Sequence, residues 1–465
     1  MNSFHDDNIH EECGVFGVFG VENAAEITYL GLQALQHRGQ EACGIVTVDE
    51  NGRLLRVRGQ GLVSEVFNDA SVKSLHGLMA IGHVRYSTSG GKDGIDNVQP
   101  LLFRQEAGDF ALCHNGNIVN SAILHRYLEE QGCLFQSTSD SEIVAHLIKK
   151  GPMNRDRKRF FAIKSALNMI EGAFAFMILT SDRLYICRDK YGFRPLALGR
   201  IGDGYVVSSE TCAFSLVGAT FERDIKPGEV LSIDANGTIS SLYSEFHRSA
   251  MCAMEYIYFA RPDSDIEGTN VHAFRKESGR LLYKEAPAEA DIVVGVPDSS
   301  LSAAIGYSEA SGIPYEMGLV KNRYIGRTFI QPSQKMRDFS VRMKLSPVVG
   351  IVKGKRVVLI DDSIVRGTTS LRIVRMLRQA GAAEVHVRIA SPSIIAPCYY
   401  GVDISSYEEL LCHRMDVEGA RKAIEADSLD FLSKEALYKA AAREDLCISC
   451  FTNEYPTALY NDRDE

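Results

Sequence analysis

The stretch 357–369 constrains the fold of this chain more than any other part of its sequence. It opens with a run of apolar residues without polar alternation, which is typical of a parallel strand buried on both faces. The run ends in Asp361 and Asp362, and a loop rich in Ser, Gly and Thr follows. A buried strand, a polar loop and a helix in this order predict one βα unit of a parallel sheet.

The rest of the second half shows the same alternation of buried strands and helices. Residues 291–297 form a second unbroken apolar run, and a helix is expected at 301–310. Apolar residues at three-residue spacing after the Ser/Thr loop predict another helix, and residues 384–390 close a β-α-β unit. This half is therefore predicted to be an α/β domain with a parallel sheet and crossover helices.

The first half reads differently, as short apolar strands punctuated by glycine. Strands are predicted at 13–20, 42–48, 79–85 and 173–179, and helices at 24–36 and 139–150. Many strands with few helices favour an α+β layered domain. The change between the two patterns falls near 235–250, and no long linker separates them.

Composition excludes several classes of protein. The 465 residues allow two or three domains, and 45% hydrophobic with 24% charged residues are typical of an ordinary globular chain. A net charge of −9 does not favour non-specific binding to nucleic acid or to an anionic membrane. No apolar run approaches the roughly 18–20 residues of a spanning helix, and the polar N-terminus lacks a signal-peptide core. We therefore expect a cytoplasmic protein, in which eleven cysteines do not form a disulfide framework.

The acid pair and its loop indicate a specific ligand chemistry. Backbone N–H groups, hydroxyls and a helix N-terminus can hold a phosphate. Asp361 and Asp362 at the strand end can accept hydrogen bonds from sugar hydroxyls or hold Mg²⁺ through water. Phosphate beside a diol or metal describes a ribose 5-phosphate. The alternative is a polar strand-to-helix turn with solvated acids.

Four clusters in the first half carry side chains that are candidates for a catalytic or binding site. Cys13 lies beside glycine at the head of an apolar strand, and Arg85 follows another strand. Asn115 and Gly116 offer an amide and a permissive N–H, the components of an oxyanion hole. Asp140 can hold a substrate ammonium. Taken alone, a cysteine at such a position is more often structural than catalytic.

The second-half motifs resemble those of type I phosphoribosyltransferases. The resemblance implies 5-phosphoribosyl 1-pyrophosphate (PRPP) and Mg²⁺ as ligands, a pyrophosphate loop at 296–300, and a mobile basic flap at 321–330 with 342–344. The positions it assigns to PRPP are Ser300, Arg323, Lys344, Asp361, Asp362, Ser363, Arg366, Gly367, Thr368 and Thr369. It assigns Mg²⁺, one ion per subunit, to Ser299, Asp361 and Asp362.

The first-half clusters resemble the glutaminase domain of N-terminal-nucleophile amidotransferases. The resemblance implies Cys13 as nucleophile with its own α-amine, whose ordinary pKa is about 8, as base. It assigns the oxyanion hole to Asn115 and Gly116. It assigns glutamine binding to Arg38, Arg85 and Asp140. Because twelve residues precede Cys13, it also implies a propeptide, 1–12, cleaved at the Glu12–Cys13 bond.

A C-x₂-C pair, Cys447 and Cys450, lies near the C-terminus. Alone it is a zinc half-site, a redox pair or neither. Combined with the other motifs, it makes the chain similar to the iron–sulfur subgroup of the glutamine PRPP amidotransferases. That resemblance implies one [4Fe-4S] cluster per subunit on Cys252, Cys398, Cys447 and Cys450. Zinc on the same ligands stays open, and Cys412 is expected to be structural.

The family resemblance implies conversion of glutamine, PRPP and water into 5-phosphoribosylamine, glutamate and pyrophosphate, the committed step of de novo purine synthesis. It divides the chain into a propeptide (1–12), a glutaminase domain (13–245) and a phosphoribosyltransferase domain (246–465), with ammonia passing through a shielded channel. It also implies a homotetramer inhibited by AMP, ADP and GMP. The alternatives are a hexosamine synthase, which the ribose-phosphate loop opposes, and a PRPP-sensing nucleic-acid-binding regulator, which the net charge opposes.

Overall fold

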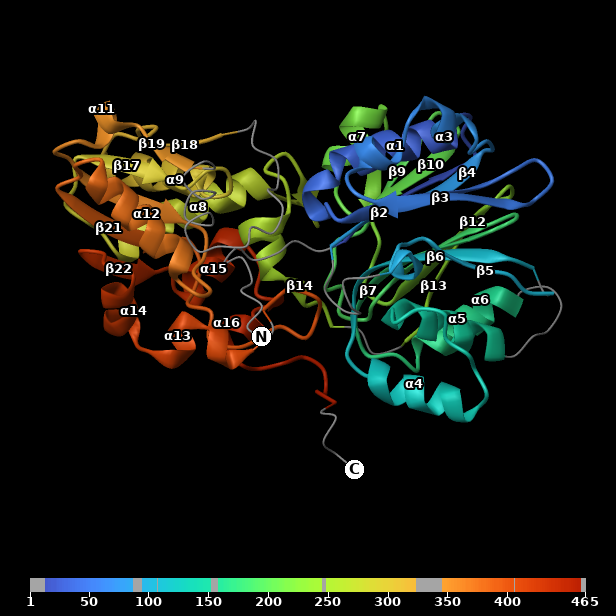
Figure 1. The fold of residues 1–465 in the computed structure, drawn as a ribbon. Coiled ribbons are helices and arrows are strands. Elements are labelled where there is room, and N and C mark those ends of the chain that lie inside the picture. The colour runs from blue at the N-terminus through green and yellow to red at the C-terminus, as the bar shows by residue number, and fades with distance from the viewer. Residues whose placement is uncertain are drawn as a thin grey trace.

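The computed structural model describes residues 13–86, 94–106, 108–151, 158–244, 248–322, 345–404 and 406–460, the side chain of Lys158 excepted. Two lobes follow the two halves of the sequence (Figure 1). The first lobe, blue to green, is built around two antiparallel sheets, and the second, yellow to red, around a parallel sheet. The change from one architecture to the other lies between Leu242 and Met251.

The first lobe has four layers, with two sheets packed face to face between helices (Figure 1). In spatial order the seven-stranded sheet contains β11 (Thr220–Asp224), β9 (Ala197–Ile201), β10 (Gly204–Ser208), β1 (Gly14–Phe19), β4 (Met79–Arg85), β2 (Ala42–Val48) and β3 (Leu54–Gln60). The six-stranded sheet contains β13 (Gly237–Leu242), β12 (Glu229–Asp234), β8 (Leu184–Arg188), β7 (Gly172–Thr180), β6 (Phe110–Ile118) and β5 (Leu101–Phe103).

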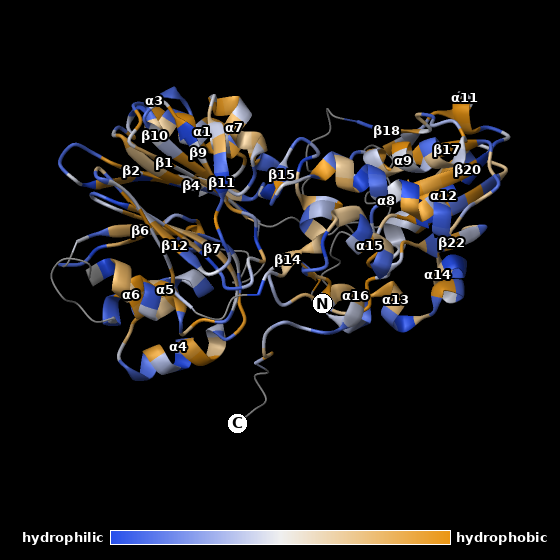
Figure 2. Ribbon diagram, turned by 180° about the vertical axis from the view of Figure 1, so that it is seen from behind, coloured by the Kyte–Doolittle hydropathy of each residue, from blue (hydrophilic) through white to orange (hydrophobic). Residues whose placement is uncertain are grey.

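Helices cover the outer face of each sheet. On the seven-stranded sheet lie α1 (Ala24–Ala34), α2 (Val63–Val66), α3 (Asp69–Lys73) and α7 (Cys212–Val217), with the short η1 (Gln36–Arg38). On the six-stranded sheet lie α4 (Ser121–Glu130), α5 (Asp140–Lys150) and α6 (Lys158–Leu167). A further short turn, η2 (Ile95–Asn97), precedes β5. Hydropathy colouring shows apolar strands between these layers (Figure 2), because each sheet buries both of its faces.

The second lobe is a parallel sheet with helices on both faces. The strand order is β17 (Ile292–Gly295), β20 (Arg356–Asp361), β21 (Glu384–Ile389) and β22 (Ser428–Phe431). One face packs on α8 (Val271–Glu285), α9 (Leu301–Ser311) and α15 (Lys434–Ala441), and the other on α12 (Thr368–Gln379) and α14 (Val417–Ala423). Successive residues of β20 enter opposite cores, which explains its unbroken apolar run.

Short elements connect and close the second lobe. They are β14 (Met251–Cys252) paired with β23 (Leu446–Cys447), the π-helical turn η3 (Glu255–Phe259), β15 (Asp265–Ile266) with β16 (Thr269–Asn270), β18 (Leu319–Lys321) with β19 (Leu345–Pro347), α11 (Val349–Val352), η4 (Tyr407–Glu409), α13 (Leu411–Arg414) and α16 (Ser449–Thr452). The predicted strands and helices of both halves are confirmed, with ends shifted by one or two residues. Among the helices described, none is long and apolar enough to cross a membrane.

Candidate active sites

Cys13 stands directly before β1, at one end of the seven-stranded sheet. Gly14 pairs with Val84 of β4, so this end of β1 lies beside the end of β4. The half-buried Cys13 thiol donates a hydrogen bond to the carbonyl of Tyr86 at 3.7 Å. The backbone therefore holds the predicted nucleophile next to the strand that ends in Arg85, which is half-buried.

Asn115 and Gly116 lie next to one another on β6. Asn115 is fully buried, yet neither its amide nitrogen nor its amide oxygen has a hydrogen-bond partner within the described part of the chain. An unsatisfied buried amide is costly and requires an explanation, which a ligand oxygen would supply. Gly116 has φ +138°, and a Cβ there would lie 2.1 Å from the carbonyl oxygen of Ala173, so only glycine fits.

His83 links the two sheets beside this site. It pairs with Val15 on β1, and its Nε2 lies 3.0 Å from the carbonyl oxygen of His114 on β6. Burial lowers the pKa of His83 to about 3, so the ring is neutral at physiological pH. This contact holds the strand that follows the nucleophile against the strand that carries Asn115.

Asp140, the first residue of α5, faces the same end of β6. Its Oδ2 accepts a hydrogen bond from the backbone N–H of Ile118 at 3.0 Å. Burial raises the pKa of Asp140, but the charge of His114 and the hydrogen bonds from Ile118 and Ser141 outweigh burial and lower it. Asp140 is therefore a carboxylate, as binding of a substrate ammonium requires.

Arg38 has different partners from those expected of a glutamine-binding residue. Its buried guanidinium donates from Nη1 to Glu210 at 2.7 Å, and from Nη1 and Nη2 to Glu255 at 2.9 and 2.7 Å. Its Nε donates to the carbonyl of Cys13 at 3.3 Å. In this structure Arg38 therefore supports the backbone of Cys13, and its terminal nitrogens are taken by carboxylates.

This ion network joins the two lobes. Glu255 belongs to the second lobe and also accepts a hydrogen bond from Arg194 of the first lobe at 3.2 Å. Glu210 accepts from Ser264 of the second lobe at 2.7 Å. Neither glutamate was predicted to be functional. For Glu255 the available signal was a lone acid inside the apolar stretch 251–259, whereas Glu210 follows two serines and gives no such signal.

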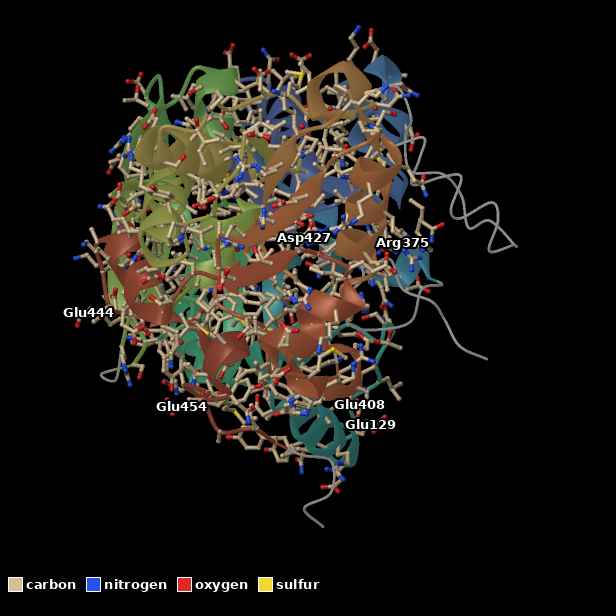
Figure 3. The ribbon with its side chains drawn as sticks, turned by 90° about the vertical axis from the view of Figure 1, so that its left-hand side faces the viewer. Glu129, Arg375, Glu408, Asp427, Glu444 and Glu454 are labelled. Carbon is tan, nitrogen blue, oxygen red and sulfur yellow. The ribbon has the colours of Figure 1, made fainter. Side chains whose placement is uncertain are left out.

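We expect Glu255→Gln to reduce glutamine-dependent turnover by about ten- to a hundredfold while ammonia-dependent turnover is preserved. The reason is that the substitution leaves the buried Arg38 with Glu210 as its remaining carboxylate partner, so that its guanidinium is held less firmly; breaking a buried ion pair costs roughly 3–5 kcal/mol. Steady-state rates with each nitrogen source measure the split, and melting temperature reports on folding. Glu425→Gln, which removes the partner of the exposed Arg375 (Figure 3), is the control. Equal loss with both nitrogen sources would contradict the expectation.

The acid pair lies where β20 meets its loop. Ser300 Oγ donates to Asp361 at 3.1 Å, and Ser299 Oγ donates to Asp362. Ser363 Oγ donates to the other oxygen of Asp362 at 2.7 Å. The loop after β17 and the loop after β20 therefore meet at the carboxyl edge of the sheet, where ligands bind in open α/β folds.

Electrostatics at this edge favour a cation or a hydrogen-bond donor. Burial and the neighbouring Asp362 charge raise the pKa of Asp361, and burial raises that of Asp362. Arg275 of α8, which lines the same cavity, partly offsets the negative charge of Asp362. Two adjacent buried carboxylates are the donor set that suits a hydrated Mg²⁺ ion and a ribose diol.

A cavity of about 460 Å³ opens from the acid pair toward the first lobe. Its wall includes Asp361 and Asp362 on one side, and His37 and Gln40 on the other. Several predicted PRPP or metal positions line it: Ser299, Asp361, Asp362, Ser363, Gly367 and Thr369. Ser300 does not line the cavity itself but donates to Asp361 at 3.1 Å and to Asp362 at 3.5 Å, and Thr368 does not line it.

The basic positions differ from the prediction. Arg366 forms an ion pair with Glu409 at 2.6 Å and does not line the cavity, so its assignment to PRPP is not supported in this conformation. Arg323 and Lys344 lie outside the described residues, as does most of the predicted flap. Lys321 at its start contacts Asp298 of the pyrophosphate loop at 2.8 Å. Because Lys321 pairs with Leu345, both ends of the flap segment lie at the cavity wall.

The four cysteines predicted to bind a cluster converge from three segments. Cys252 pairs with Cys447 across β14 and β23, and the carbonyl of Cys450 accepts hydrogen bonds from residues 395 and 396, just before Cys398. In the described part of the chain none of the four is in a disulfide, and three are buried. Burial and the charges of the other three raise the pKa of Cys450, which places the four in one electrostatic environment.

These cysteines lie at the junction of the two lobes. Cys447 packs in one apolar cluster with Tyr400 of the second lobe and with Ala173 and Phe193 of the first. The rings of Phe193 and Tyr400 stack with centroids 4.2 Å apart. Within the described ranges, no group of three or more His, Cys, Asp or Glu side chains is arranged to hold a single metal ion.

A glutamine amidotransferase site in an αββα lobe, joined to a phosphoribosyltransferase site on a parallel sheet, defines a two-domain nitrogen-transferring enzyme. The chain matches the glutamine amidotransferase domain family over residues 83–215 and the phosphoribosyl transferase domain family over 269–392. It is 55% identical to the amidophosphoribosyltransferase of Bacillus subtilis over 98% of this chain and 96% of that one. It is 49% identical to chloroplastic amidophosphoribosyltransferase 1 of Arabidopsis thaliana, over 98% of this chain and 80% of that one.

Comparison with a solved structure points to the same family as the sequence comparison. The B. subtilis glutamine PRPP amidotransferase complexed with ADP and GMP superimposes with a TM-score of 0.91 at 54% identity, covering 97% of this chain and 98% of that one. This chain belongs to the amidophosphoribosyltransferase family. The predicted fold class, enzyme class and reaction are therefore confirmed: glutamine and PRPP are converted to 5-phosphoribosylamine, glutamate and pyrophosphate in purine biosynthesis.

Proposed function

We propose that this chain releases ammonia from glutamine at Cys13 and adds it to C1 of PRPP at the loop after β20. The observation that carries this assignment is the cavity whose wall includes His37 and Gln40 from one lobe and the acid pair from the other. Ammonia is small and easily lost or protonated in water, so a route between the sites has to be shielded from solvent. The cavity supplies part of that route.

At the first site, the Cys13 thiol attacks the amide carbon of glutamine while the Cys13 α-amine takes the thiol proton. Asn115 and the N–H of Gly116 stabilise the oxyanion that develops. The amine returns the proton to the leaving ammonia, and water then hydrolyses the thioester to glutamate. Arg85 and Asp140 bind the carboxylate and ammonium of the substrate. The amine exists only after removal of residues 1–12, which lie outside the described residues.

We expect Asn115→Ala to lower the turnover number for glutamine by about 10²–10³-fold, because one oxyanion donor contributes that much. The Michaelis constant for glutamine should change much less, since Asn115 acts on the transition state. Ammonia-dependent synthesis is the internal control and should be unaffected. A variant that loses ammonia-dependent synthesis to the same degree would remove Asn115 from this role.

At the second site, ammonia attacks C1 of the ribose and pyrophosphate leaves. Ser363, Gly367 and Thr369 hold the 5-phosphate, and Asp361 and Asp362 hold the ribose hydroxyls. A Mg²⁺ ion bound at this edge near Ser299 would neutralise charge on the leaving pyrophosphate. The contact between Lys321 and Asp298 supports a flap that closes over the pyrophosphate loop.

The convergence of Cys252, Cys398, Cys447 and Cys450 supports one [4Fe-4S] cluster per subunit, and on this basis we propose that the chain belongs to the iron–sulfur, propeptide-containing subgroup. Such a cluster would join three segments of the second lobe where it meets the first lobe. We expect anaerobically purified protein to contain about four iron atoms and four sulfides per chain. Cys450→Ser should lower both and reduce the melting temperature, whereas Cys412→Ser should change neither. One zinc and no sulfide per chain would establish the alternative.

The B. subtilis structure with ADP and GMP bound supports feedback inhibition by purine nucleotides, and we propose AMP, ADP and GMP as inhibitors of this chain. A homotetramer and a cytoplasmic location complete the proposal. Rates at increasing nucleotide concentration and sedimentation velocity test the inhibition and the assembly.

A further inference from the structure

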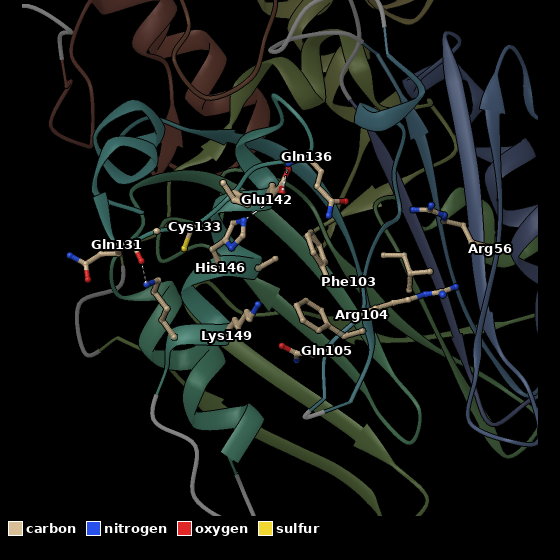
Figure 4. A pocket seen from close by; sticks show the side chains of 16 residues that line it. Arg56, Phe103, Arg104, Gln105, Gln131, Cys133, Gln136, Glu142, His146 and Lys149 are labelled. Atoms are coloured by element: carbon tan, nitrogen blue, oxygen red, sulfur yellow. Dashed lines mark hydrogen bonds and ion pairs between the residues drawn. The ribbon is translucent and has the colours of Figure 1, made fainter. Parts of the chain in front are cut away.

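A cavity of about 740 Å³ lies on the first lobe (Figure 4), and it is lined by other residues than those assigned to the two candidate sites. We call it the edge pocket, because β3 and β5, the edge strands of the two sheets, contribute to its wall along with α5. None of its lining residues lines the cavity between the lobes, and none is assigned to glutamine. Its volume is in the range of small-molecule sites.

Positive charge dominates the edge pocket. Arg56, Arg104, Lys149 and Lys150 line it, and none of the four forms an ion pair with an acidic side chain among the residues the structure describes. Figure 4 shows Arg56 and Arg104 converging from β3 and from the end of β5, while Lys149 comes from α5.

Glu142 is the acidic residue in the lining of the edge pocket, and its carboxylate does not pair with these four cations. Both oxygens of Glu142 are occupied, one by the backbone N–H of Gln136 at 2.8 Å and the other by the N–H and hydroxyl of Ser137 at 2.7 and 2.6 Å. Burial lowers the pKa of Arg56, and the charges of Arg58 and Arg104 lower it further, while Asp96 opposes them. A bound anion would relieve this repulsion.

We propose that the edge pocket is a binding site for a small phosphate-bearing molecule. Arginine forks and lysine ammonium groups are the side chains that bind phosphate oxygens. The floor is apolar: the ring of Phe103 stacks on Phe110 with centroids 5.2 Å apart, which would suit an organic group attached to the phosphate. The shared chemistry is the phosphate, whether inorganic or organic.

The test is isothermal titration of the full chain with inorganic tripolyphosphate and, separately, with phenyl phosphate. The pocket variant is Arg56→Gln/Arg104→Gln. The control is Arg375→Gln/Arg378→Gln, which removes the same charge from the exposed face of α12 (Figure 3). We expect wild type and control to bind one more anion per chain than the pocket variant does, or to bind it at least tenfold more tightly. Lys149→Gln should weaken anion binding less than the pocket variant does. As a single substitution it provides a second test if the double variant does not fold.

Turnover with glutamine and with ammonia should be unchanged in the pocket variant, because its residues lie outside both sites. Binding of tripolyphosphate alone would identify an inorganic polyanion, and binding of phenyl phosphate would identify an organic phosphate; either supports the site. Equal binding by wild type and pocket variant, or wild-type binding that PRPP removes entirely, would overturn it.

Discussion

Cys13→Ala is expected to abolish glutamine-dependent synthesis, by at least about 10⁴-fold, while synthesis from ammonia continues at the wild-type rate. Removal of a nucleophile costs this much because the covalent route is lost and only binding and oxyanion stabilisation are left. Ammonia reaches C1 of PRPP without the thiol. Cys13 lies before β1 on the first lobe and does not line the cavity that contains the acid pair, so the substitution leaves that site unchanged.

The measurement is glutamate release and pyrophosphate release from the same samples, with glutamine or ammonium chloride as the nitrogen source. Cys412→Ala is the matched control, since Cys412 packs against the core of the second lobe. Mass spectrometry of the purified wild-type chain should find Cys13 as the first residue. Loss of both activities in Cys13→Ala, or of neither, would contradict the division of labour between the lobes.

Asp361→Asn/Asp362→Asn is expected to abolish PRPP turnover with either nitrogen source, by at least about 10³-fold, and to raise the melting temperature in magnesium-free buffer. Activity falls because amides neither neutralise a cation nor accept hydrogen bonds from the ribose as carboxylates do. Stability rises because burial and mutual repulsion raise the pKa of Asp361 and burial raises that of Asp362, so the charged forms weaken folding.

The pH dependence of this stability gain has a definite sign. A carboxyl whose pKa is raised in the folded state weakens folding at pH values where the unfolded chain has lost that proton. The difference in melting temperature between variant and wild type should therefore be largest at neutral pH and vanish as pH falls below the usual aspartate range. Glu454→Gln, at an exposed carboxylate (Figure 3), should show no such trend. A melting temperature that falls in the double variant would contradict this account.

Local patterns predicted the second lobe well. The unbroken apolar run of β20 reported burial on both faces, and the acids at its end had to lie at the carboxyl edge of a parallel sheet. The loop glycine and hydroxyls could be assigned to phosphate because consecutive residues of a strand, loop and helix stay together in space. Arg366 was the exception: its long side chain reaches Glu409, a partner distant in sequence.

The first lobe was harder, because its site is assembled from strands far apart in the chain. The roles of Cys13, Asn115 and Asp140 could be predicted from the sequence. The arrangement of their side chains, however, depends on the pairing of β1 with β4 and on the contact of His83 with β6. Arg38 illustrates the limit. Its neighbours in sequence suggested glutamine, whereas its actual partners, Glu210 and Glu255, come from remote segments.

The amino-acid sequence by itself thus determined the two fold classes, the reaction and the residue types at each site, because strand periodicity and short motifs are local properties of the chain. Only the tertiary structure decided how the lobes are joined. The buried Arg38–Glu255 ion pair, the cavity from His37 to Asp362 and the convergence of four cysteines all bring together segments hundreds of residues apart. Such contacts depend on three-dimensional packing, which no local pattern encodes.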